Sequence, residues 1–223
     1  MTSTRTDLSR RALLSATGAV SLAAILAACS DTGADGKAVS TGASIDYDTV
    51  INSGPVASDD VVTASSWASA IRQAGVFRTG GTMTLPVFSS QDAATGRVSG
   101  FDAAIGQVLA RYIIGGDDAR SLLEVQQVTA DTRETVLTNG TVKAVIATYT
   151  ITPERAKKID FAGPYYASSQ AILVKADNKD ITGVDTLTGD VAVQSNSSSA
   201  AALKKYAPKA TAKPFDTQAK CVA

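Results

Sequence analysis

Three threonines and an arginine lie where an apolar run gives way to a predicted helix. Thr148, Thr150 and Thr152 alternate along the chain, and Arg155 follows in the first turn of a helix that opens at Pro153. The first N–H groups of a helix have no partner inside it and attract anions. A guanidinium there opposes the helix dipole, a cost that makes sense if it faces a bound carboxylate in a charge-assisted pair. The segment is therefore a candidate carboxylate-binding site.

Arg155 also has an ordinary structural explanation. It could pair with Glu124, Glu154 or Asp160 on a solvated face, where ion pairs are common and contribute little. The residue types and their spacing leave the two interpretations open.

Strands and helices alternate around this segment from residue 82 onward. Short apolar runs predict strands at residues 83–87, 122–128, 143–148, 159–161 and 171–175. Apolar residues at the 3.6-residue period predict a helix from Phe101 to Ile113, ended by Gly115. A capping-box pattern at Asp131 opens a second predicted helix, which ends at Gly140. The β-α-β-α-β order implies a mostly parallel sheet with helices on both faces, a class that binds ligands at the carboxyl ends of its strands.

A second unit is predicted after Lys179. Its expected elements are a strand at 191–194, a helix capped by residues 196–199, a strand at 213–215 and a helix from residue 216. At the other end, a stretch rich in Ser, Thr, Gly, Asp and Ala predicts a flexible linker over residues 29–66. A short helix carrying Trp67 and Ile71 is expected to dock where this linker ends.

The first 28 residues have the pattern of a signal peptide. Arg10 and Arg11 precede 17 uncharged residues, Ala12–Ala28, and small residues stand before Cys29. The tetrad that ends at Cys29 resembles the lipobox of bacterial lipoproteins, in which the signal is removed and the cysteine sulfur carries lipid. Residues 9–14 also resemble a twin-arginine export signal. A retained transmembrane helix is the alternative, although the stretch is at the short limit for spanning.

Composition excludes several kinds of chemistry. The chain has no histidine, which excludes Ser-His-Asp or Cys-His catalysis and any His-ligated metal within it. With Cys29 assigned to lipid, Cys221 has no second cysteine for an internal disulfide. The leader holds three of the 21 basic residues and one of the 21 acidic ones, so the remainder carries a net charge of −2. This balance favours neither nucleic acid nor an anionic lipid surface as a partner.

Several segments together resemble the family 3 extracellular solute-binding proteins, the receptors of ABC importers for polar amino acids. That family has a hydroxyl-rich run with Thr-x-x-Arg, followed by a hydrophobic-Asp-Phe-Ser/Ala-x-Pro-Tyr stretch. Parts of the pattern are found at residues 100–102, 139–142, 147–155, 159–166 and 187–189. Residues 92–96 and 133–135 further resemble the glutamate-binding branch in actinobacteria, and the whole resemblance covers residues 76–221.

The resemblance implies an α/β fold, a two-lobe clamp of the periplasmic-binding-protein-like type II class. Residues 67–176 would form the first lobe, and residues 177–223 the start of an incomplete second lobe. Such a protein binds glutamate or a similar polar amino acid without cofactor or metal and delivers it to an ABC permease. It would be exported and held on the outer face of the cell membrane by lipid, including palmitate, on Cys29.

The resemblance also implies which residues contact the ligand. In the family the ligand's α-carboxylate meets the motif arginine, here Arg155, and a hydroxyl that corresponds to Thr150. The other expected site residues are Thr148, Tyr149, Phe88, Ser197 and Ser198. Asn196 replaces the glycine that precedes the hydroxyl pair in the family, and because Asn tolerates positive φ the turn is expected to persist. Core packing of the aromatics and an ordinary helix cap for the serines are the alternatives.

The sequence departs from the family pattern in three ways, of which the first two are expected to weaken binding. Few residues separate Met83 from Phe88, which removes part of the first-lobe wall. The sequence stops at Ala223, before the family's aspartate for the ligand's α-ammonium and before the return strand. Cys221 corresponds to half of a disulfide whose other half would fall near Ala192. The expectation is a C-terminally truncated or decaying member of the family, or an incomplete sequence of one, whose partial second lobe is mobile or prone to self-association.

Two other functions are weighed against this one. An enzyme on the same fold, a dehydratase or a lytic transglycosylase, would need a positioned acid. The only glutamates are Glu124, Glu134 and Glu154, all on predicted helix starts or strands rather than in a cleft loop. A surface sensor or adhesion lipoprotein would need no clamp at all.

Overall fold

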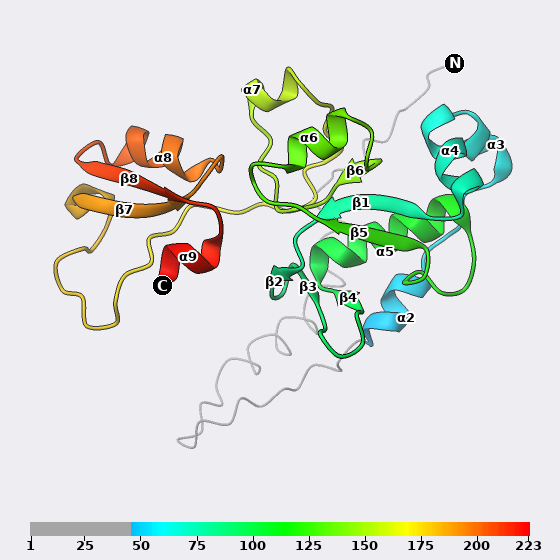
Figure 1. The fold of residues 1–223 in the computed structure, drawn as a ribbon, viewed down its shortest axis with the longest axis horizontal. Helices are drawn as coiled ribbons and strands as arrows, with labels where there is room; N and C mark the ends of the chain where they lie inside the picture. Colours follow the sequence, from blue (N-terminus) through cyan, green and yellow to red (C-terminus); the bar gives the residue numbers. More distant parts are fainter. Residues whose placement is uncertain (1–45) are drawn as a thin grey trace, which may run out of the picture. The chain divides into compact units, whose positions relative to one another are not determined.

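Residues 46–223 are described by the computed structural model, in which helices and strands alternate along the chain (Figure 1). The predicted signal peptide, Cys29 and the first part of the predicted linker lie outside the described residues. Within the described part, no helix has both the length and the apolar character needed to cross a membrane.

Two short helices occupy the second half of the predicted linker. They are α2 (Tyr47–Asn52) and α3 (Asp59–Thr63). Ile51 and Val62, one from each helix, are 0% and 2% exposed. The structure therefore differs from the predicted flexible linker from residue 47 onward. Each helix is anchored by one buried apolar residue among small polar ones. One such residue per helix changes the composition too little to distinguish the segment from a linker.

Three parallel strands form the central sheet, in the order β5-β1-β6 (Figure 1). The strands are β1 (Phe77–Gly81), β5 (Leu123–Gln127) and β6 (Ala144–Val145). The register of β1 with β5 runs from Phe77 opposite Leu123 to Gly81 opposite Gln127. The predicted parallel sheet is confirmed, although β6 is shorter than the apolar run at 143–148.

The first strand lies earlier in the chain than predicted. The apolar run at 83–87 is not the sheet strand, because β1 occupies residues 77–81, whose letters FRTGG show no apolar run. Its two glycines allow the close strand contact: a Cβ on Gly81 would lie 2.8 Å from Cγ1 of Val125. Small residues at a crowded position leave no hydropathy signal, which is why the strand was missed.

Residues 84–99 form a small antiparallel sheet between β1 and the next helix. Its strands are β2 (Thr84–Leu85), β3 (Ser89–Gln91) and β4 (Val98–Ser99), in the order β2-β3-β4. Gly100 then turns the chain into the helix with a φ of 120°. A Cβ at this glycine would lie 2.5 Å from the carbonyl oxygen of Phe88, so only glycine fits the turn.

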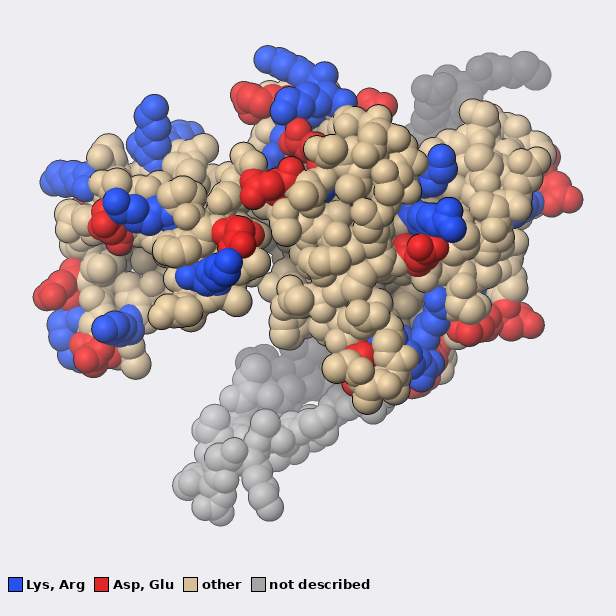
Figure 2. All heavy atoms as spheres, viewed as in Figure 1, with Lys and Arg blue, Asp and Glu red and all other residues tan. Residues whose placement is uncertain are grey.

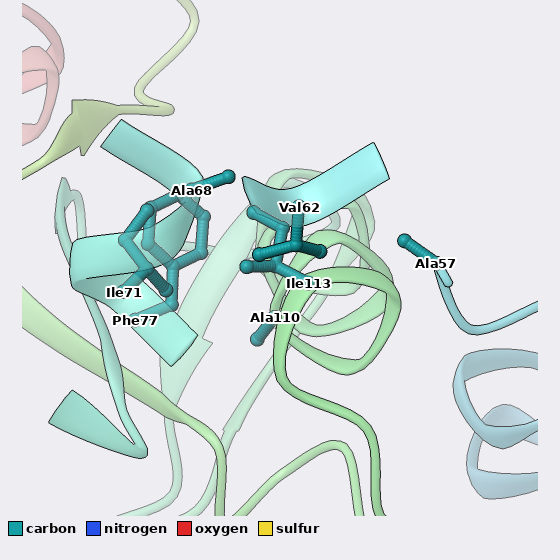
Figure 3. Close-up of a cluster of buried hydrophobic side chains, with 7 residues drawn as sticks. All are labelled: Ala57, Val62, Ala68, Ile71, Phe77, Ala110 and Ile113. Atoms are coloured by element: carbon teal, nitrogen blue, oxygen red, sulfur yellow. The ribbon is translucent and has the colours of Figure 1, made fainter. Parts of the chain in front are cut away.

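The main helix, α5, spans Phe101–Ile114, as its apolar period predicted. It packs with α4 (Ser66–Ala74) and β1 around a buried cluster. The cluster is made of Ala57, Val62, Ala68, Ile71, Phe77, Ala110 and Ile113 (Figure 3). This core supports the central sheet, and its edge strand β6 leads to the segment with the three threonines, residues 148–152.

Two short helices flank that segment, α6 (Arg133–Thr138) and α7 (Pro153–Ala156). The capping box predicted at Asp131 does not form, because Thr132 is the N-cap of α6 and makes no side-chain cap bond. The start predicted for α7 is confirmed: Thr152 accepts a hydrogen bond from the N–H of Arg155.

The strands predicted at 159–161 and 171–175 are not formed, since the described residues between α7 and residue 184 contain no strand. Leu173, in the second run, is 77% exposed. An apolar run becomes a strand only where a neighbour satisfies its backbone groups. No strand among the described residues pairs with this run, so the apolar letters alone were misleading.

A second parallel pair follows, β7 (Gly189–Gln194) and β8 (Ala210–Phe215). Between them lies α8 (Ser199–Tyr206), and α9 (Gln218–Val222) comes after β8. A short 3-10 turn, η2 (Val184–Thr186), precedes β7. We call β7, α8, β8 and α9 the β7–β8 unit. Its strand-helix-strand-helix order is the predicted one.

Candidate functional site

The Arg155 side chain faces carbonyl oxygens and an aromatic ring rather than a carboxylate. Its Nη1 donates to the carbonyl oxygen of Thr150 at 2.7 Å, and its Nη2 donates to the carbonyl oxygen of Asn196 at 2.7 Å. Its guanidinium carbon lies 4.2 Å from the centre of the Tyr149 ring. None of the ion pairs among the described residues joins it to an acid, and Glu124 pairs with Arg78 instead. The surface ion-pair interpretation therefore does not hold.

A second guanidinium, that of Arg133, converges on the same place. Arg133 is 7% exposed, and its Nη2 donates to the carbonyl oxygen of Asn196 at 3.3 Å. Its Nη1 donates to the carbonyl oxygen of Ala147 at 3.4 Å, while its buried Nε has no partner among the described residues. Burial, together with the charge of Arg155, lowers the pKa of Arg133 to about 10, which still leaves it protonated at neutral pH.

Arg133 was not among the predicted site residues. It entered the sequence analysis only as part of a three-residue resemblance, yet the argument applied to Arg155 fits it as well. Both arginines lie in the first turn of a short helix, where a positive charge opposes the helix dipole. An arginine in the first turn of a predicted helix is the signal that would have found it.

Tyr149 is the platform on which both guanidinium groups rest. The guanidinium carbon of Arg133 lies 3.8 Å from the ring centre, and cation–π contacts of this kind stabilise a nearby cation. The Tyr149 hydroxyl donates to Glu134, which also accepts from Nζ of Lys158 at 3.1 Å. These bonds, first that of Tyr149, hold the pKa of the Glu134 carboxyl below its ordinary value. Tyr149 therefore orients the cations in this structure.

Two of the threonines make different contacts: the side chain of Thr150 approaches the β7–β8 unit, whereas the backbone of Thr148 is bonded to α5. Oγ1 of Thr150 lies 3.3 Å from Oγ of Ser198. Thr148 has a φ of 46°, and its N–H donates to Oδ2 of Asp102 at 2.9 Å. Asp102 is 1% exposed and also accepts from the hydroxyl of Tyr165 at 3.1 Å. Burial raises the pKa of its carboxyl. Each of its two oxygens accepts one of these hydrogen bonds, so Asp102 fixes the backbone of Thr148.

The two predicted serines behave differently. Ser198 approaches Thr150, whereas the hydroxyl of Ser197 donates to the carbonyl oxygen of Gln194 at 2.6 Å and accepts from the N–H of Ser199 at 3.2 Å. Ser197 thus closes the turn before α8. Asn196 has a φ of 50°, the conformation expected when it replaces glycine. The structure brings Ser198 to the arginines' side of the turn and uses Ser197 as a local cap.

Phe88 belongs to a separate aromatic cluster. Its ring centre is 5.3 Å from that of Tyr166, which in turn lies 5.6 Å from Phe101. The carbonyl oxygen of Phe88 accepts from the N–H of Asp102 at 2.7 Å. These contacts link Phe88 to the residues that support Thr148 rather than to the guanidinium groups.

The site is a local concentration of positive charge on a mixed surface. On the face shown in Figure 2, acidic and basic side chains are interspersed without a large area of one sign. Two guanidinium groups and two hydroxyls in one place suit a carboxylate ligand. Among the described residues no group of three or more Cys, Asp or Glu could hold a metal ion. Glu134, the one glutamate in contact with the site, has a lowered pKa, the opposite of what a general acid needs.

The parallel sheet, its crossover helices and the second strand-helix-strand unit define the class of protein. The chain has the α/β fold of periplasmic-binding-protein-like, type II proteins. It is similar to an ancestral amino acid-binding protein described as a precursor of cyclohexadienyl dehydratase, with a TM-score of 0.63 and 33% identity over 71% of this chain and 69% of that one. An ancestral arginine-binding protein bound to arginine gives a TM-score of 0.58 at 33% identity, over 66% of this chain and 64% of that one.

The chain belongs to the bacterial extracellular solute-binding proteins, family 3, whose family model matches residues 77–217. It is 35% identical to the glutamine-binding protein of Geobacillus stearothermophilus over 150 residues, 67% of this chain and 56% of that protein. It is 31% identical to the glutamate-binding protein GluB of Corynebacterium efficiens over 130 residues, 56% of this chain and 44% of that protein. The chain spans about half the length of the curated relatives it matches.

Proposed function

We propose that the chain is the ligand-binding part of an ABC importer for a polar amino acid, with glutamate as the expected ligand. The observation that carries this proposal is the convergence of the Arg155 and Arg133 side chains on one acceptor, the carbonyl oxygen of Asn196. A carboxylate offers the same kind of acceptor with a full negative charge. It would therefore pair more strongly than the carbonyl with both guanidinium groups.

Within this proposal each group has a separate role. Arg155 and the hydroxyl of Thr150 bind the α-carboxylate, and Ser198 contributes from the β7–β8 unit. Tyr149 keeps both cations in place through its ring. The second cation, Arg133, favours a ligand with a second carboxylate, which selects glutamate over glutamine or arginine. The names of the curated relatives, which are glutamine- and glutamate-binding proteins, support a ligand of this size.

The proposed receptor works outside the cell and hands its ligand to a permease in the membrane. Membership of an extracellular solute-binding family supports export. The lipobox-like residues before Cys29 support a lipid anchor. Cys29→Ser would remove the lipidated sulfur, so the protein should move from the membrane fraction to the medium. An unchanged membrane fraction would contradict the anchor without touching ligand binding.

Ligand-dependent thermal unfolding of the purified protein tests the binding proposal. A ligand that binds only the native state raises the Tm by mass action. L-Glutamate at millimolar concentration should raise the Tm more than L-glutamine or L-arginine, and Arg155→Ala should abolish the shift. Arg78→Ala is the matched control, because its guanidinium pairs with Glu124 on an exposed face and the shift should persist. A wild-type protein that responds to none of these amino acids, or a shift that survives Arg155→Ala, would refute the proposal.

A further inference from the structure

Asn196 joins three segments of the chain at the site. Its carbonyl oxygen accepts from Nη2 of Arg155 at 2.7 Å and from Nη2 of Arg133 at 3.3 Å. Its side-chain amide donates to the Oδ1 carboxylate oxygen of Asp131, in the loop before α6. One residue in the turn before α8 is thus bonded to α6, to α7 and to the loop between β5 and α6.

The backbone of Asn196 explains why one residue can do this. Its φ of 50° is in the left-handed region, which asparagine adopts more readily than most residues, and in this turn its carbonyl and its side chain both reach residues of other segments. Glycine would adopt this φ more easily and would present the same carbonyl. It would lack the amide that reaches Asp131, so the contact with Asp131 is what asparagine adds.

The Asn196 carbonyl uses the donors that the proposed ligand needs. Each guanidinium gives one Nη2 hydrogen bond to this oxygen, and a ligand carboxylate at the same point must displace it. We propose that Asn196 and Asp131 form a latch that holds the carbonyl on the two arginines in the ligand-free protein and so lowers the affinity for ligand. This inference rests on the proposed function, and it makes Asn196 an affinity-determining residue that competes with the ligand.

Asp131 is a suitable anchor for such a latch. It is exposed, and its own backbone N–H is held locally by Oγ1 of Thr129 at 3.3 Å. Its carboxylate makes no other hydrogen bond or ion pair among the described residues. Removing that carboxylate therefore leaves the loop and the core intact, so a change in affinity reports on the latch rather than on folding.

Titration calorimetry with L-glutamate on three variants tests the competition. Asn196→Gly keeps the turn and the carbonyl, and Asp131→Ala removes the anchor. Each should tighten binding about fivefold, the effect of losing a competing hydrogen bond worth about 1 kcal/mol. The double variant should bind no more tightly than either single one, because both remove the same contact. Weaker binding in either single variant would overturn the proposal.

The charge of Asp131 needs its own control. Removing a carboxylate near two arginines raises the local positive potential, which by itself favours an anionic ligand. Asn196→Gly changes no charge, so its effect is free of this term. If Asp131→Ala tightens binding equally in the wild-type and Asn196→Gly backgrounds, its effect is electrostatic and the latch is overturned. Asp117→Ala, which removes an exposed carboxylate in the loop after α5, should leave the affinity unchanged.

Amide hydrogen exchange tests the latch without any ligand. In the ligand-free protein, Asn196→Gly and Asp131→Ala should both speed exchange in residues 195–199 and in 129–134, while β1 exchanges as in the wild type. Unchanged exchange in either segment would overturn the latch even if ligand binds. If the wild-type protein binds no amino acid, the proposed function fails, and amide hydrogen exchange still decides whether the latch exists.

Discussion

The β1 sheet and the β7–β8 unit share a strand-helix-strand plan but differ sharply in how much apolar surface they bury. Around β1, Phe77 and Ala110 are fully buried. In the β7–β8 unit, Tyr206 and Phe215 are 58% and 39% exposed, and Val193 is one of its few buried apolar residues. Because apolar burial is the main favourable term in folding, the same topology does not give the two regions the same stability.

This difference bears on the site, which takes its parts from both regions. The two arginines lie in the first turns of α6 and α7, next to the well-packed sheet, whereas Asn196 and Ser198 precede α8. Regions with few buried contacts open locally at low free-energy cost. We therefore expect Arg133 and Arg155 to keep their positions, and the Asn196 carbonyl oxygen that accepts from them to be the part that moves away.

The largest expected effect comes from truncating one aromatic side chain in each region, Phe77 in the core and Phe215 at an exposed position. Phe77→Ala should lower the free energy of unfolding by about 3–5 kcal/mol, because it opens a cavity in the main cluster. Phe215→Ala should cost less than about 1 kcal/mol, as is usual for a partly exposed position. Urea unfolding followed by circular dichroism measures both regions, while the fluorescence of Trp67, whose ring centre lies 5.7 Å from that of Phe77, reports on the β1 region. Equal losses of stability in the two variants would show that the two regions do not differ in packing as described.

A smaller effect is expected from the buried carboxylate that joins the sheet to the site. Asp102→Ala leaves the N–H of Thr148 and the hydroxyl of Tyr165 without their acceptor. Unmet polar groups of this kind cost about 1–3 kcal/mol, and the raised pKa of Asp102 indicates that part of the loss is offset by removing a buried charge. The free energy of unfolding, measured with urea, and the affinity for glutamate should both fall.

The control for this variant is Asp102→Asn, which keeps one acceptor oxygen and should lose less stability. Hydrogen exchange separates the two regions. Amides of β7 and β8 should exchange at wild-type rates in both variants, because neither strand contacts Asp102. Faster exchange there would show that the second unit depends on this buried contact, and the two regions would then have to be treated as one.

The sequence predicted the elements with clear periodicity or capping and missed those set by crowding or by pairing. α5 and the Thr152 cap of α7 follow local rules, and both were predicted. β1 was missed because its glycines matter through the close approach of Val125, a contact absent from local sequence. The apolar run around Leu173 failed in the opposite way, since a strand also needs a neighbour.

The candidate site was predicted in part for the same reason. Arg155, Thr150 and Ser198 were expected and lie together, while Phe88 lies in the aromatic cluster behind Thr148. Arg133 was missed because its burial and its approach to Tyr149 depend on chain segments far apart in sequence. Local patterns predict which groups could bind a carboxylate, but only the tertiary structure shows which of them converge.

The smallest predicted effect concerns the pH dependence of stability at the border between the two regions. Hydrogen bonds from Tyr149 and then Lys158 hold the pKa of Glu134 below its ordinary value of 4.5. A carboxyl with a lowered folded-state pKa stabilises the protein above its ordinary pKa, and this contribution is lost as the pH falls below that value. Glu134→Gln should therefore lose less than about 1 kcal/mol at neutral pH, as expected for a partly exposed pair. The stability of this variant should also decline less steeply than that of the wild type as the pH falls.

Urea midpoints at a series of pH values measure this pH dependence, with Glu124→Gln as the control for an exposed pair with Arg78. An acid decline as steep in Glu134→Gln as in the wild type would mean that Tyr149 is held by its two cations alone, and that the better-packed region orients the site without this carboxylate.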